Sequence, residues 1–429
     1  MATKTNSLLM ISGPSGIGKT TLVSSLISRW PKSYIRPISL TSRAKRSGED
    51  GSEYSFVDRK TIMHEFERGN LANLDTVYGN VYAIQKSSID DALQKGISPI
   101  KEIHPTNHYK LRNLYPCSVA VLVLPDNGFQ NNSYHDARQQ EDAEFYSKVD
   151  LDDFDIITRT SRTSGIDAFV EDAHWAIQSY LAGRDRFPSP CLIDKTNADG
   201  YGKVAGRFTT EERPTTANFH DLSAPFFAEA ISKLPDGSRC LEVGPGQGWL
   251  RKSFDWPPVH YSALDLAAGM ISTLDFETTA AEKVSASARA MPFSSGSFDR
   301  VFASLGDGYC YPTALAEIRR VLKKNGHFYF TAPSRVWADG LRNSSASNKT
   351  QFLLPDGSAA EVFSFALSTE ELEKVFSQCG FRLNSIEVVH GDKLPPGSMI
   401  SNALIESARR LNIALDSLPI INTISAIKN

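Results

Sequence analysis

Short runs of apolar residues alternate along the chain with segments in which apolar residues recur at every third or fourth position. A short apolar run is typical of a buried strand, and the three-to-four spacing is typical of one face of a helix. The expected strands are residues 8–11, 119–124, 239–243, 260–264, 299–304, 328–331 and 420–427. The expected helices are residues 19–29, 169–181, 226–234 and 315–322. Strands that alternate with helices predict parallel α/β sheets in both halves of the chain.

Two of these elements carry more detailed expectations. Asn325 and Gly326 follow the helical segment 315–322, and residues of this kind are common where a helix ends in the left-handed conformation. We therefore expect that helix to end at this pair. The run 420–427 is the last of the strands, and we expect it to be an edge strand.

The alternating pattern breaks between residues 184 and 216, where Pro, Gly and charged residues are frequent and no apolar period is sustained. A chain of 429 residues is long enough for two or three domains of about 150 residues each. We therefore expect a first domain over residues 1–183, a linker over 184–197 and a second domain over 198–429.

The composition is that of a folded protein and excludes several classes. Hydrophobic residues make up 41% and charged residues 22%, and the formal net charge is −3. These values argue against a disordered chain and against a globally basic nucleic-acid-binding protein. No apolar stretch approaches the ~20 residues that span a bilayer, and the N-terminus lacks the features of a signal peptide. The five cysteines are scattered without a C-x-x-C pair, which favours a reducing, cytoplasmic setting.

The clearest chemical motif runs from Gly13 to Thr20 and fits G-x-x-x-x-G-K-[ST]. It follows an expected strand and opens an expected helix, which is the context that a phosphate-binding loop requires. Its glycines let backbone N–H groups turn toward phosphate oxygens, and the helix N-terminus adds partial positive charge. Lys19 is expected to reach the β- and γ-phosphates of ATP or GTP, and Thr20 to coordinate the accompanying Mg²⁺. The residues expected to bind ATP are Gly13, Ser15, Gly16, Ile17, Gly18, Lys19, Thr20 and Thr21.

A basic and aromatic segment follows this loop. Arg43 and Arg46 lie close together, Tyr54 comes shortly after them, and residues 79–82 read G-N-x-Y. Two arginines with two tyrosine hydroxyls can hold a phosphate group. Together with the phosphate-binding loop, these motifs resemble guanylate kinases over roughly residues 7–182. The resemblance implies that the phosphate of an acceptor is bound by Ser39, Arg43, Arg46, Tyr54 and Tyr82.

The sequence departs from the guanylate kinase pattern at the base-binding and lid positions. Asn73 stands where the family has a glutamate that binds the guanine edge, and Ile84 stands where it has a hydroxyl residue. The third strand of the family usually ends in an acidic pair, of which only Glu102 remains, and the lid region keeps few arginines. The departures favour another phosphorylated nucleoside, a modified guanine or a sugar phosphate as the acceptor. The catalytic residues implied by the resemblance are Lys19, Arg43, Glu102 and Arg138.

A second glycine-rich loop, Gly244–Gly248, follows the expected strand 239–243. Such a loop lets the backbone approach a cofactor, but dehydrogenases share it. Asp265 ends the next expected strand, where its carboxylate can accept hydrogen bonds from both hydroxyls of a ribose. The run Ala290–Asp299, which contains M-P-F-x-x-x-S-F-D, is not a dehydrogenase feature.

Together with Glu317–Phe328, these motifs resemble class I SAM-dependent methyltransferases of the small-molecule type over roughly residues 198–429. The resemblance implies a Rossmann-like, seven-stranded domain in which Tyr201–Phe208 closes over SAM. One departure is Ser287, which replaces an acid that often binds the adenine amine. The residues implied to bind SAM are Glu242, Gly244, Gly246, Gly248, Asp265, Leu266, Ala290, Met291 and Ser304.

The segment 335–365 is an insertion after the fourth strand, at a place where acceptor pockets are often built. Its aromatic residues Trp337, Phe352 and Phe363 are either walls of such a pocket or ordinary core residues, and the sequence leaves both readings open.

The sequence therefore predicts a bifunctional α/β enzyme, with an N-terminal P-loop sheet like that of nucleoside monophosphate kinases and a C-terminal methyltransferase domain. The first domain is expected to phosphorylate a phosphate-bearing nucleotide or sugar phosphate with ATP and Mg²⁺. The second is expected to methylate the same or a related metabolite with SAM. The alternative is a methyltransferase with a non-catalytic, regulatory nucleotide-binding domain, which the altered base-binding residues favour and the intact Lys19 and Thr20 oppose. The expected partner is a small phosphorylated molecule rather than a membrane or a nucleic acid, and no pattern specifies an oligomeric state.

Overall fold

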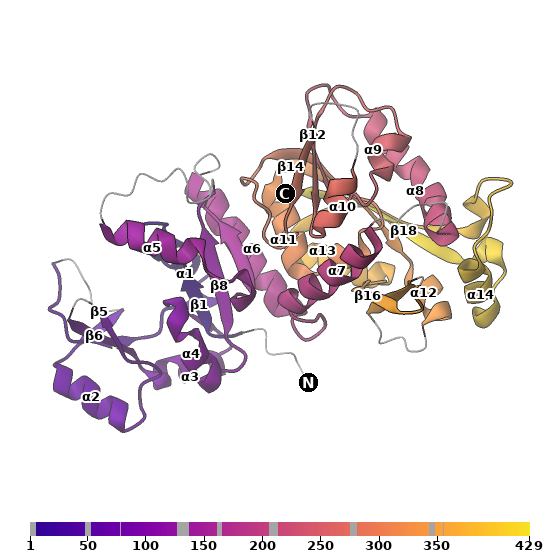
Figure 1. Ribbon diagram of the computed structural model, residues 1–429. Coiled ribbons are helices and arrows are strands. Elements are labelled where there is room, and N and C mark those ends of the chain that lie inside the picture. Colours follow the sequence, from indigo (N-terminus) through magenta and orange to yellow (C-terminus); the bar gives the residue numbers. More distant parts are fainter. Residues whose placement is uncertain are drawn as a thin grey trace. The chain divides into compact units, whose positions relative to one another are not determined.

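The computed structural model describes residues 6–47, 53–77, 79–126, 137–160, 165–205, 213–274, 281–342, 348–354 and 356–429. The chain forms two compact units, Met1–Ile177 and Gln178–Asn429 (Figure 1). Within the described residues, no helix combines the length and the apolar character needed to cross a bilayer.

A five-stranded parallel sheet forms the centre of the first unit, in the order β2-β7-β1-β8-β9. The two central strands β1 and β8 are buried along their whole length, which agrees with their continuous apolar sequences. The strands are β1 (Leu9–Ser12), β2 (Tyr34–Ile35), β7 (Ser98–Glu102), β8 (Val119–Leu124) and β9 (Ile156–Arg159).

A second, four-stranded sheet in the same unit has the order β4-β3-β6-β5. Helix α2 (Arg59–Glu67) packs on it through Ile62, which forms a small core with Leu40 and Val81. The strands are β3 (Ser39–Thr41), β4 (Tyr54–Phe56), β5 (Asp75–Val77) and β6 (Asn80–Ile84). This small sheet carries most of the residues that the sequence assigns to the acceptor phosphate.

The other helices of the first unit connect and flank the strands. They are α1 (Lys19–Arg29), α3 (Lys86–Gln94), α4 (His108–Leu114), α5 (Ala137–Ser147) and α6 (Gly165–Gly183), with 3₁₀ turns at Pro105–Asn107 and Leu151–Asp153. Helix α1 has the bounds that the sequence predicts.

The second unit contains a seven-stranded sheet in the order β12-β11-β10-β13-β14-β18-β17. The first five strands run parallel, and β18 pairs antiparallel with both β14 and β17. The strands are β10 (Arg239–Val243), β11 (His260–Asp265), β12 (Ala281–Ser285), β13 (Phe298–Ala303), β14 (Leu322–Pro333), β17 (Phe381–His390) and β18 (Pro419–Lys428). This arrangement confirms the predicted seven-stranded α/β class.

Helices and a hairpin surround this sheet. The helices are α7 (Pro190–Val204), α8 (Pro214–Ser232), α9 (Trp249–Ser253), α10 (Ala268–Thr273), α11 (Pro312–Val321), α12 (Arg335–Leu341), α13 (Thr369–Gln378) and α14 (Asn402–Leu411), with 3₁₀ turns at Gly306–Tyr309, Gly391–Lys393 and Leu415–Ser417. The hairpin strands are β15 (Lys349–Leu353) and β16 (Ala359–Phe363), so the predicted insertion 335–365 is an ordered helix and hairpin in its described parts.

Two local predictions were wrong. Strand β18 lies between β14 and β17 rather than at the edge, because it is buried along nearly its whole length and pairs on both sides. Helix α11 ends before Leu322, which already pairs with Phe298 as the first residue of β14. The positive φ of Asn325, 61°, therefore belongs to a bend within a strand and not to a helix cap.

The predicted linker 184–197 and the predicted helix 226–234 also look different in the structure. Helix α7 begins at Pro190 inside the expected linker, and the hydroxyl of Ser189 caps it by accepting from Leu192 N at 3.3 Å. Helix α8 begins at Pro214 and continues through Pro225, where the sequence analysis placed a boundary. Tertiary packing of Phe219 and Leu222 compensates for the proline in this helix.

Candidate active sites

The phosphate-binding loop of the first unit joins the carboxyl end of β1 to α1. Gly16 and Gly18 have φ values of 77° and 98°, which other residues rarely adopt. A Cβ atom at Gly13 would lie 2.5 Å from the carbonyl oxygen of Val123, so no side chain fits there. Thr20 and Thr21 are exposed in the first turn of α1. The motif therefore has the strand–loop–helix context that the sequence predicts.

A carboxylate from α5 lies in this loop. Both the backbone N–H and the hydroxyl of Ser15 donate to Oδ2 of Asp142, the former at 3.1 Å. Tyr146, one turn further along α5, hydrogen-bonds with the backbone of Gly13. The Lys19 ammonium donates to the carbonyl oxygens of Gly13 and Pro14 at 2.6 and 2.8 Å. The loop thus already holds an anionic oxygen of the kind that a phosphate presents.

Four of the five predicted acceptor residues come together on the small sheet. Ser39 pairs with Tyr54 between β3 and β4, and the rings of Tyr54 and Tyr82 lie 6.0 Å apart in an edge contact. The Arg43 guanidinium lies 5.2 Å from the centroid of the Tyr54 ring. Arg46 is exposed on the loop that follows β3. The hydroxyl of Ser39 is buried and has no hydrogen-bond partner among the described residues.

The side chain of Asn73 is used within the protein. Its Oδ1 accepts from Ile84 N at 2.9 Å, and its Nδ2 donates to Oδ2 of Asp75 at 2.8 Å. The residue is only 5% exposed. Because its amide oxygen and its amide nitrogen are both hydrogen-bonded within the protein, Asn73 has a structural role in the small sheet.

Sequence reasoning missed two cations near the acceptor residues. Arg36 donates to both carboxylate oxygens of Glu102, at 3.1 and 2.9 Å, and also pairs with Glu53. The Lys101 ammonium lies 4.5 Å from the Tyr54 ring centroid and is buried without a hydrogen-bond partner among the described residues. Burial lowers the pKa of Lys101 to about 8, an effect that Glu102 opposes. The strand Ser98–Glu102 reads S-P-I-K-E, so its sequence gave little sign that Lys101 is buried.

The remaining predicted catalytic residue, Arg138, lies in α5, and its side chain is outside the described part of the structure. Within that described part, no cluster of three or more His, Cys, Asp or Glu side chains is arranged to hold a metal ion.

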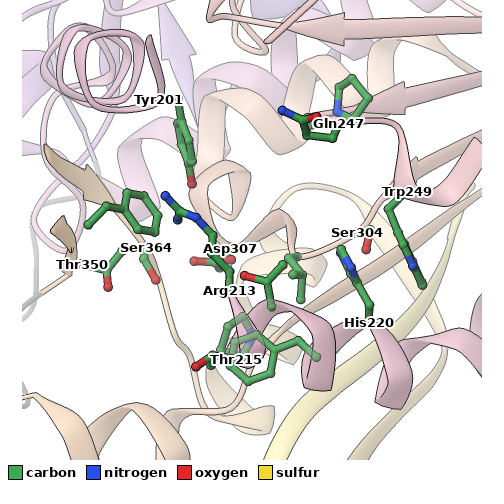
Figure 2. A pocket seen from close by; sticks show the side chains of 18 of the residues that line it. Tyr201, Arg213, Thr215, His220, Gln247, Trp249, Ser304, Asp307, Thr350 and Ser364 are labelled. Atoms are coloured by element: carbon green, nitrogen blue, oxygen red, sulfur yellow. The ribbon is translucent and has the colours of Figure 1, made fainter. Parts of the chain in front are cut away.

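The second unit has a cavity of about 810 Å³ at the carboxyl ends of its parallel strands (Figure 2). Ligands bind at this edge in open α/β sheets, and the volume lies in the upper part of the usual range of about 300–1,000 Å³ for small-molecule sites. Five of the residues that the sequence assigns to SAM line it, from the ends of β10, β11 and β13: Glu242, Gly244, Gly246, Asp265 and Ser304.

Two buried carboxyl groups, those of Glu242 and Asp265, line this cavity. Burial raises the pKa of Asp265 to about 6, although its Oδ1 accepts a hydrogen bond from Ala267 N at 2.8 Å. Burial likewise raises the pKa of Glu242 to about 7, and the Tyr261 hydroxyl donates to it. Asp265 therefore serves both α10, by bonding to its N-cap residue, and the cavity that it lines.

The glycine loop makes close approaches that only glycine permits. Gly244 has a φ of 70°, and a Cβ there would lie 2.4 Å from the ring of Tyr309. Gly248 is the N-cap of α9, with a φ of 77°. Tyr309 therefore lies over the loop from the 3₁₀ turn that follows β13.

Four predicted SAM residues are not among the described residues that line the cavity: Gly248, Leu266, Ala290 and Met291. Met291 belongs to the hydrophobic core, where its backbone N–H donates to Glu317 at 3.0 Å and its carbonyl accepts from Arg320 at 3.1 Å. Ser287 donates to Asp194 at 2.7 Å, so a carboxylate from α7 lies beside the position where this chain lacks the acid of the family pattern.

The insertion supplies walls to the cavity, as one of the two readings of its aromatic residues predicted. Trp337 and Phe352 line the cavity, whereas Phe363 is 4% exposed and packs in the core. Tyr201 also lines it, and residues 206–208 of the predicted closing segment lie outside the described residues.

One end of the cavity is charged. The Arg213 guanidinium lies 4.4 Å from the centroid of the Phe352 ring, and Arg342 donates to the carbonyl and hydroxyl oxygens of Ser364 at 2.9 and 3.1 Å. Burial raises the pKa of Asp307, and it lowers the pKa of Arg342. We call Arg213, Asp307 and Arg342 the charged end.

His220 was also missed, because its helix was expected to begin only at Phe226, whereas it begins at Pro214. The imidazole stacks on Trp249, with ring centroids 4.0 Å apart and an angle of 6° between the planes. Figure 2 shows His220, Trp249 and Ser304 together on one side of the cavity, with Arg213 and Asp307 apart from them.

Comparison with known proteins assigns both units. Residues 5–151 match the family model of guanylate kinase, and residues 241–330 match the family model of a methyltransferase domain. A curated guanylate kinase from Aromatoleum aromaticum is 39% identical over 119 residues, which cover 28% of this chain and 58% of that protein. One from Anaplasma phagocytophilum is 30% identical over 120 residues, which cover 28% of this chain and 57% of that protein. The chain therefore spans less than three fifths of the length of these two relatives.

Solved structures give weaker likenesses. A guanylate kinase from Anaplasma phagocytophilum has 21% identity and a TM-score of 0.34, with 43% of this chain and 88% of that chain covered. A putative SAM-dependent methyltransferase from Listeria monocytogenes has 15% identity and a TM-score of 0.36, with 48% and 99% covered. Because both TM-scores are below 0.5, the assignment rests on the family models. The chain contains a guanylate kinase domain followed by a methyltransferase domain.

Proposed function

We propose that the protein is a bifunctional enzyme. Its first domain transfers a phosphoryl group from ATP to a nucleotide or sugar phosphate, and its second domain transfers a methyl group from SAM to the same or a related metabolite. The observation that carries the proposal is that each glycine loop lies at the carboxyl edge of its parallel sheet beside groups suited to its own cofactor.

The phosphate-binding loop supports ATP binding. Its backbone N–H and hydroxyl groups already donate to a carboxylate, and Lys19 lies against the same loop. ATP brings its own transferable phosphoryl group, and Thr20 would hold the Mg²⁺ that accompanies it. Arg43, Tyr54 and Tyr82 would bind the acceptor phosphate, with Glu102 held nearby by Arg36.

The cavity of the second unit supports SAM binding. Asp265 would accept from the ribose hydroxyls, while the glycine loop lets the backbone approach the methionine part of the cofactor. SAM supplies a methyl group on a positively charged sulfur, so the protein mainly has to bind and align the acceptor. The remaining cavity, which extends to the insertion, offers the space for that acceptor.

Two observations favour the alternative, a methyltransferase whose guanylate kinase domain is regulatory. Asp142 occupies the phosphate-binding loop, and Asn73 is committed to bonds within the small sheet. A regulatory domain would bind a nucleotide without phosphorylating an acceptor.

One experiment separates the two functions. Purified protein is incubated with a panel of nucleoside and sugar monophosphates, ATP and Mg²⁺, with or without SAM, and the products are identified by mass spectrometry. Bifunctionality predicts a diphosphate and a methylated product from one acceptor or two related ones. The regulatory alternative predicts methylation alone.

In the same assay we expect GMP to be a poor phosphate acceptor. Asn73 cannot replace a carboxylate at the guanine edge, because its amide is engaged with Ile84 and Asp75. A missing charged hydrogen bond of about 1.5–3 kcal/mol lowers efficiency about 10- to 150-fold relative to the preferred acceptor. GMP turnover at least equal to that of every other acceptor in the panel would show that this expectation is wrong.

A further inference from the structure

Arg342, at the charged end of the methyltransferase cavity, is a half-buried cation without a carboxylate partner. It follows directly after α12 and lines the cavity. Its Nη2 donates to the carbonyl and hydroxyl oxygens of Ser364 at 2.9 and 3.1 Å, and both of these acceptors are neutral. Among the described residues, no carboxylate oxygen lies within 4.0 Å of the guanidinium. Because charges removed from water are normally paired, this cation is suited to an anionic ligand.

Other buried arginines of the second unit do have a carboxylate partner. Arg320 pairs with Glu317 at 2.6 Å, and Arg289 pairs with Asp194 at 2.7 Å. Arg342 instead has two nitrogens, Nε and Nη1, that form no hydrogen bond within the part of the chain that the structure describes. Neither nitrogen is among the polar atoms of this part that are both unpaired and shielded from solvent. A molecule in the cavity can therefore reach both nitrogens.

Ser364 joins Arg342 to a carboxylate that lines the same cavity. Its hydroxyl also hydrogen-bonds with Asp307, whose charge partly offsets the effect of burial on the pKa of Arg342. An ionised carboxylate has about four lone-pair sites, so the bond from Ser364 leaves Asp307 able to accept from a ligand. Figure 2 shows Asp307, Ser364 and Thr350 in one group and Gln247 of the glycine loop apart from them. This wall therefore presents cationic donors and an anionic acceptor that are linked through one hydroxyl.

A ligand that carries both an anion and a hydroxyl matches this wall. The open N–H groups of Arg342 can donate to the oxygens of a phosphate or a carboxylate. A ligand with an anion alone would place negative charge near Asp307, whereas a hydroxyl beside the anion would donate to that carboxylate. Sugar phosphates have both groups on one small molecule. Because the proposed function already has a nucleotide or sugar phosphate as its metabolite, the anion expected at Arg342 is phosphate.

We propose that Arg342 and Asp307 form a methyl-acceptor subsite that binds the sugar-phosphate portion of the acceptor, with the phosphate on Arg342 and a sugar hydroxyl on Asp307. The proposal rests on the SAM-dependent methyl transfer proposed above. Both residues bind and orient the acceptor, and neither exchanges a proton or the methyl group with it. Arg342 and Ser364 belong to the insertion 335–365 and not to the glycine loop, so these contacts are separate from those proposed for SAM.

The test compares probes that share a five-carbon skeleton. Ribose 5-phosphate has the phosphate and the hydroxyls, pentyl phosphate lacks the hydroxyls, ribonate has a carboxylate as its anion, and ribose has no anion. The full chain carries Arg43→Gln and is saturated with ADP and Mg²⁺, so that the phosphate sites proposed for the first unit do not contribute. Dissociation constants are measured by calorimetry with S-adenosylhomocysteine present. We expect ribose 5-phosphate to bind at least about 10-fold more tightly than ribose or pentyl phosphate. It should bind at least about threefold more tightly than ribonate, because phosphate has more charge and a third oxygen.

Arg342→Gln keeps a polar side chain and removes the cation. It should weaken ribose 5-phosphate binding about 10- to 100-fold and leave S-adenosylhomocysteine binding within about twofold. Arg382→Gln, at an exposed position of β17, removes one positive charge from the same unit and should change neither. Asp307→Asn should narrow the preference for ribose 5-phosphate over pentyl phosphate at least about threefold. Melting temperatures confirm that the variants are folded, and either Arg342→Gln or Asp307→Asn alone suffices for the test.

Three results with the probes would overturn the proposal: binding of none of them, equal binding of ribose and ribose 5-phosphate, or a preference for pentyl phosphate or ribonate. Unchanged ribose 5-phosphate binding in a folded Arg342→Gln protein would do the same. Loss of S-adenosylhomocysteine binding in Arg342→Gln would assign Arg342 to the carboxylate of the cofactor and also overturn it. If the wild-type protein binds S-adenosylhomocysteine but shows no preference for ribose 5-phosphate, the subsite is wrong and the proposed function stands. If the wild-type protein does not bind S-adenosylhomocysteine, the proposed function itself fails.

Discussion

The two glycine loops of this chain have the same backbone design and different surroundings. Each follows a central, buried parallel strand, and each ends in a left-handed glycine that caps a helix, Gly18 before α1 and Gly248 before α9. The loop of the guanylate kinase domain holds the carboxylate of Asp142. The loop of the methyltransferase domain borders a cavity of about 810 Å³.

This difference shows that a glycine loop lets the backbone approach a ligand, whereas the side chains around the loop determine which ligand binds. In the kinase domain, Ser15 and Lys19 favour an anion, which Asp142 supplies in the absence of phosphate. In the methyltransferase domain, Glu242 and Asp265 make the site acidic and suited to hydroxyl donors. The following variants test this contrast, from the largest expected effect to the smallest.

Lys19→Ala should lower ATP-dependent phosphoryl transfer at least about 1,000-fold, because Lys19 is the cation that the loop brings to the transferring phosphoryl group. SAM-dependent methylation should persist, since Lys19 belongs to the other unit. Coupled assays of both products on the same preparation measure this, with Lys32→Ala, an exposed lysine after α1, as the control. Loss of both activities in a folded variant would contradict the assignment of one activity to each unit.

Asp265→Ala should weaken SAM binding by about 2–4 kcal/mol, because two hydrogen bonds from the ribose to a charged group are lost and water replaces them in part. It should also lower the melting temperature, since Asp265 accepts from Ala267 N. Asp265→Asn separates the two roles. It keeps an oxygen for Ala267, so stability should largely return, while SAM affinity should stay low. Normal SAM affinity in both variants, with a lower melting temperature in Asp265→Ala alone, would show that Asp265 is only a helix cap.

Buried cations also differ between the two units. Arg320 of the second unit is paired with Glu317 at 2.6 Å, whereas Lys101 of the first unit is buried without a hydrogen-bond partner among the described residues. Because burial lowers the pKa of Lys101 from 10.5 to about 8, its ammonium is disfavoured in the folded state. This destabilisation is complete below pH 8, and it disappears as the pH rises to 10.5, where the unfolded chain also loses the proton.

Lys101→Met should therefore raise the free energy of unfolding by up to about 3 kcal/mol at pH 7, from 1.36 kcal/mol per pKa unit. The gain should shrink between pH 8 and pH 10.5. Urea unfolding at a series of pH values measures it, with Lys60→Met on the exposed face of α2 as the control. A gain that does not depend on pH would mean that lost packing or polarity, and not the buried charge, accounts for it.

Asp142→Asn should strengthen ATP binding about 10-fold, because the acceptor in the loop becomes a neutral amide that a phosphate displaces more easily. Glu144→Gln on the same helix is the matched control, since Glu144 pairs with Lys148 and not with the loop. The two dissociation constants are compared by calorimetry at one ionic strength. Weaker ATP binding in Asp142→Asn would mean that Asp142 helps to bind the nucleotide and does not compete with it.

The sequence predicted the groups that lie in one continuous motif and missed the groups that reach the sites from elsewhere. The loop Gly13–Thr20 was predictable because its residues and their spacing carry the function together. Asp142 and Lys101 were not, since their roles depend on which helix or ring the fold brings beside them. His220 was missed because the apolar pattern predicted this helix only over residues 226–234, whereas it begins at Pro214.

The fold, like the sites, could be predicted from local sequence patterns only in part. Short apolar runs predicted the strands β1 and β8 of the first parallel sheet and β10, β11, β13, β14 and β18 of the second. They predicted neither the remaining strands nor the place of a strand within its sheet. The sequence of β18 indicates burial, and the expectation that it is an edge strand came only from its position at the end of the series. Its neighbours β14 and β17 are set by pairing over long sequence distances, which no local pattern encodes.

The central claim is that the two loops bind two different cofactors independently. The most direct test titrates ATP with Mg²⁺ and then SAM into the full chain by calorimetry, in wild-type protein, Lys19→Ala and Asp265→Asn. The account predicts one equivalent of each cofactor in the wild type, loss of ATP binding alone in Lys19→Ala, and weakened SAM binding alone in Asp265→Asn. Competition of ATP and SAM for one site, or loss of both in either folded variant, would contradict it.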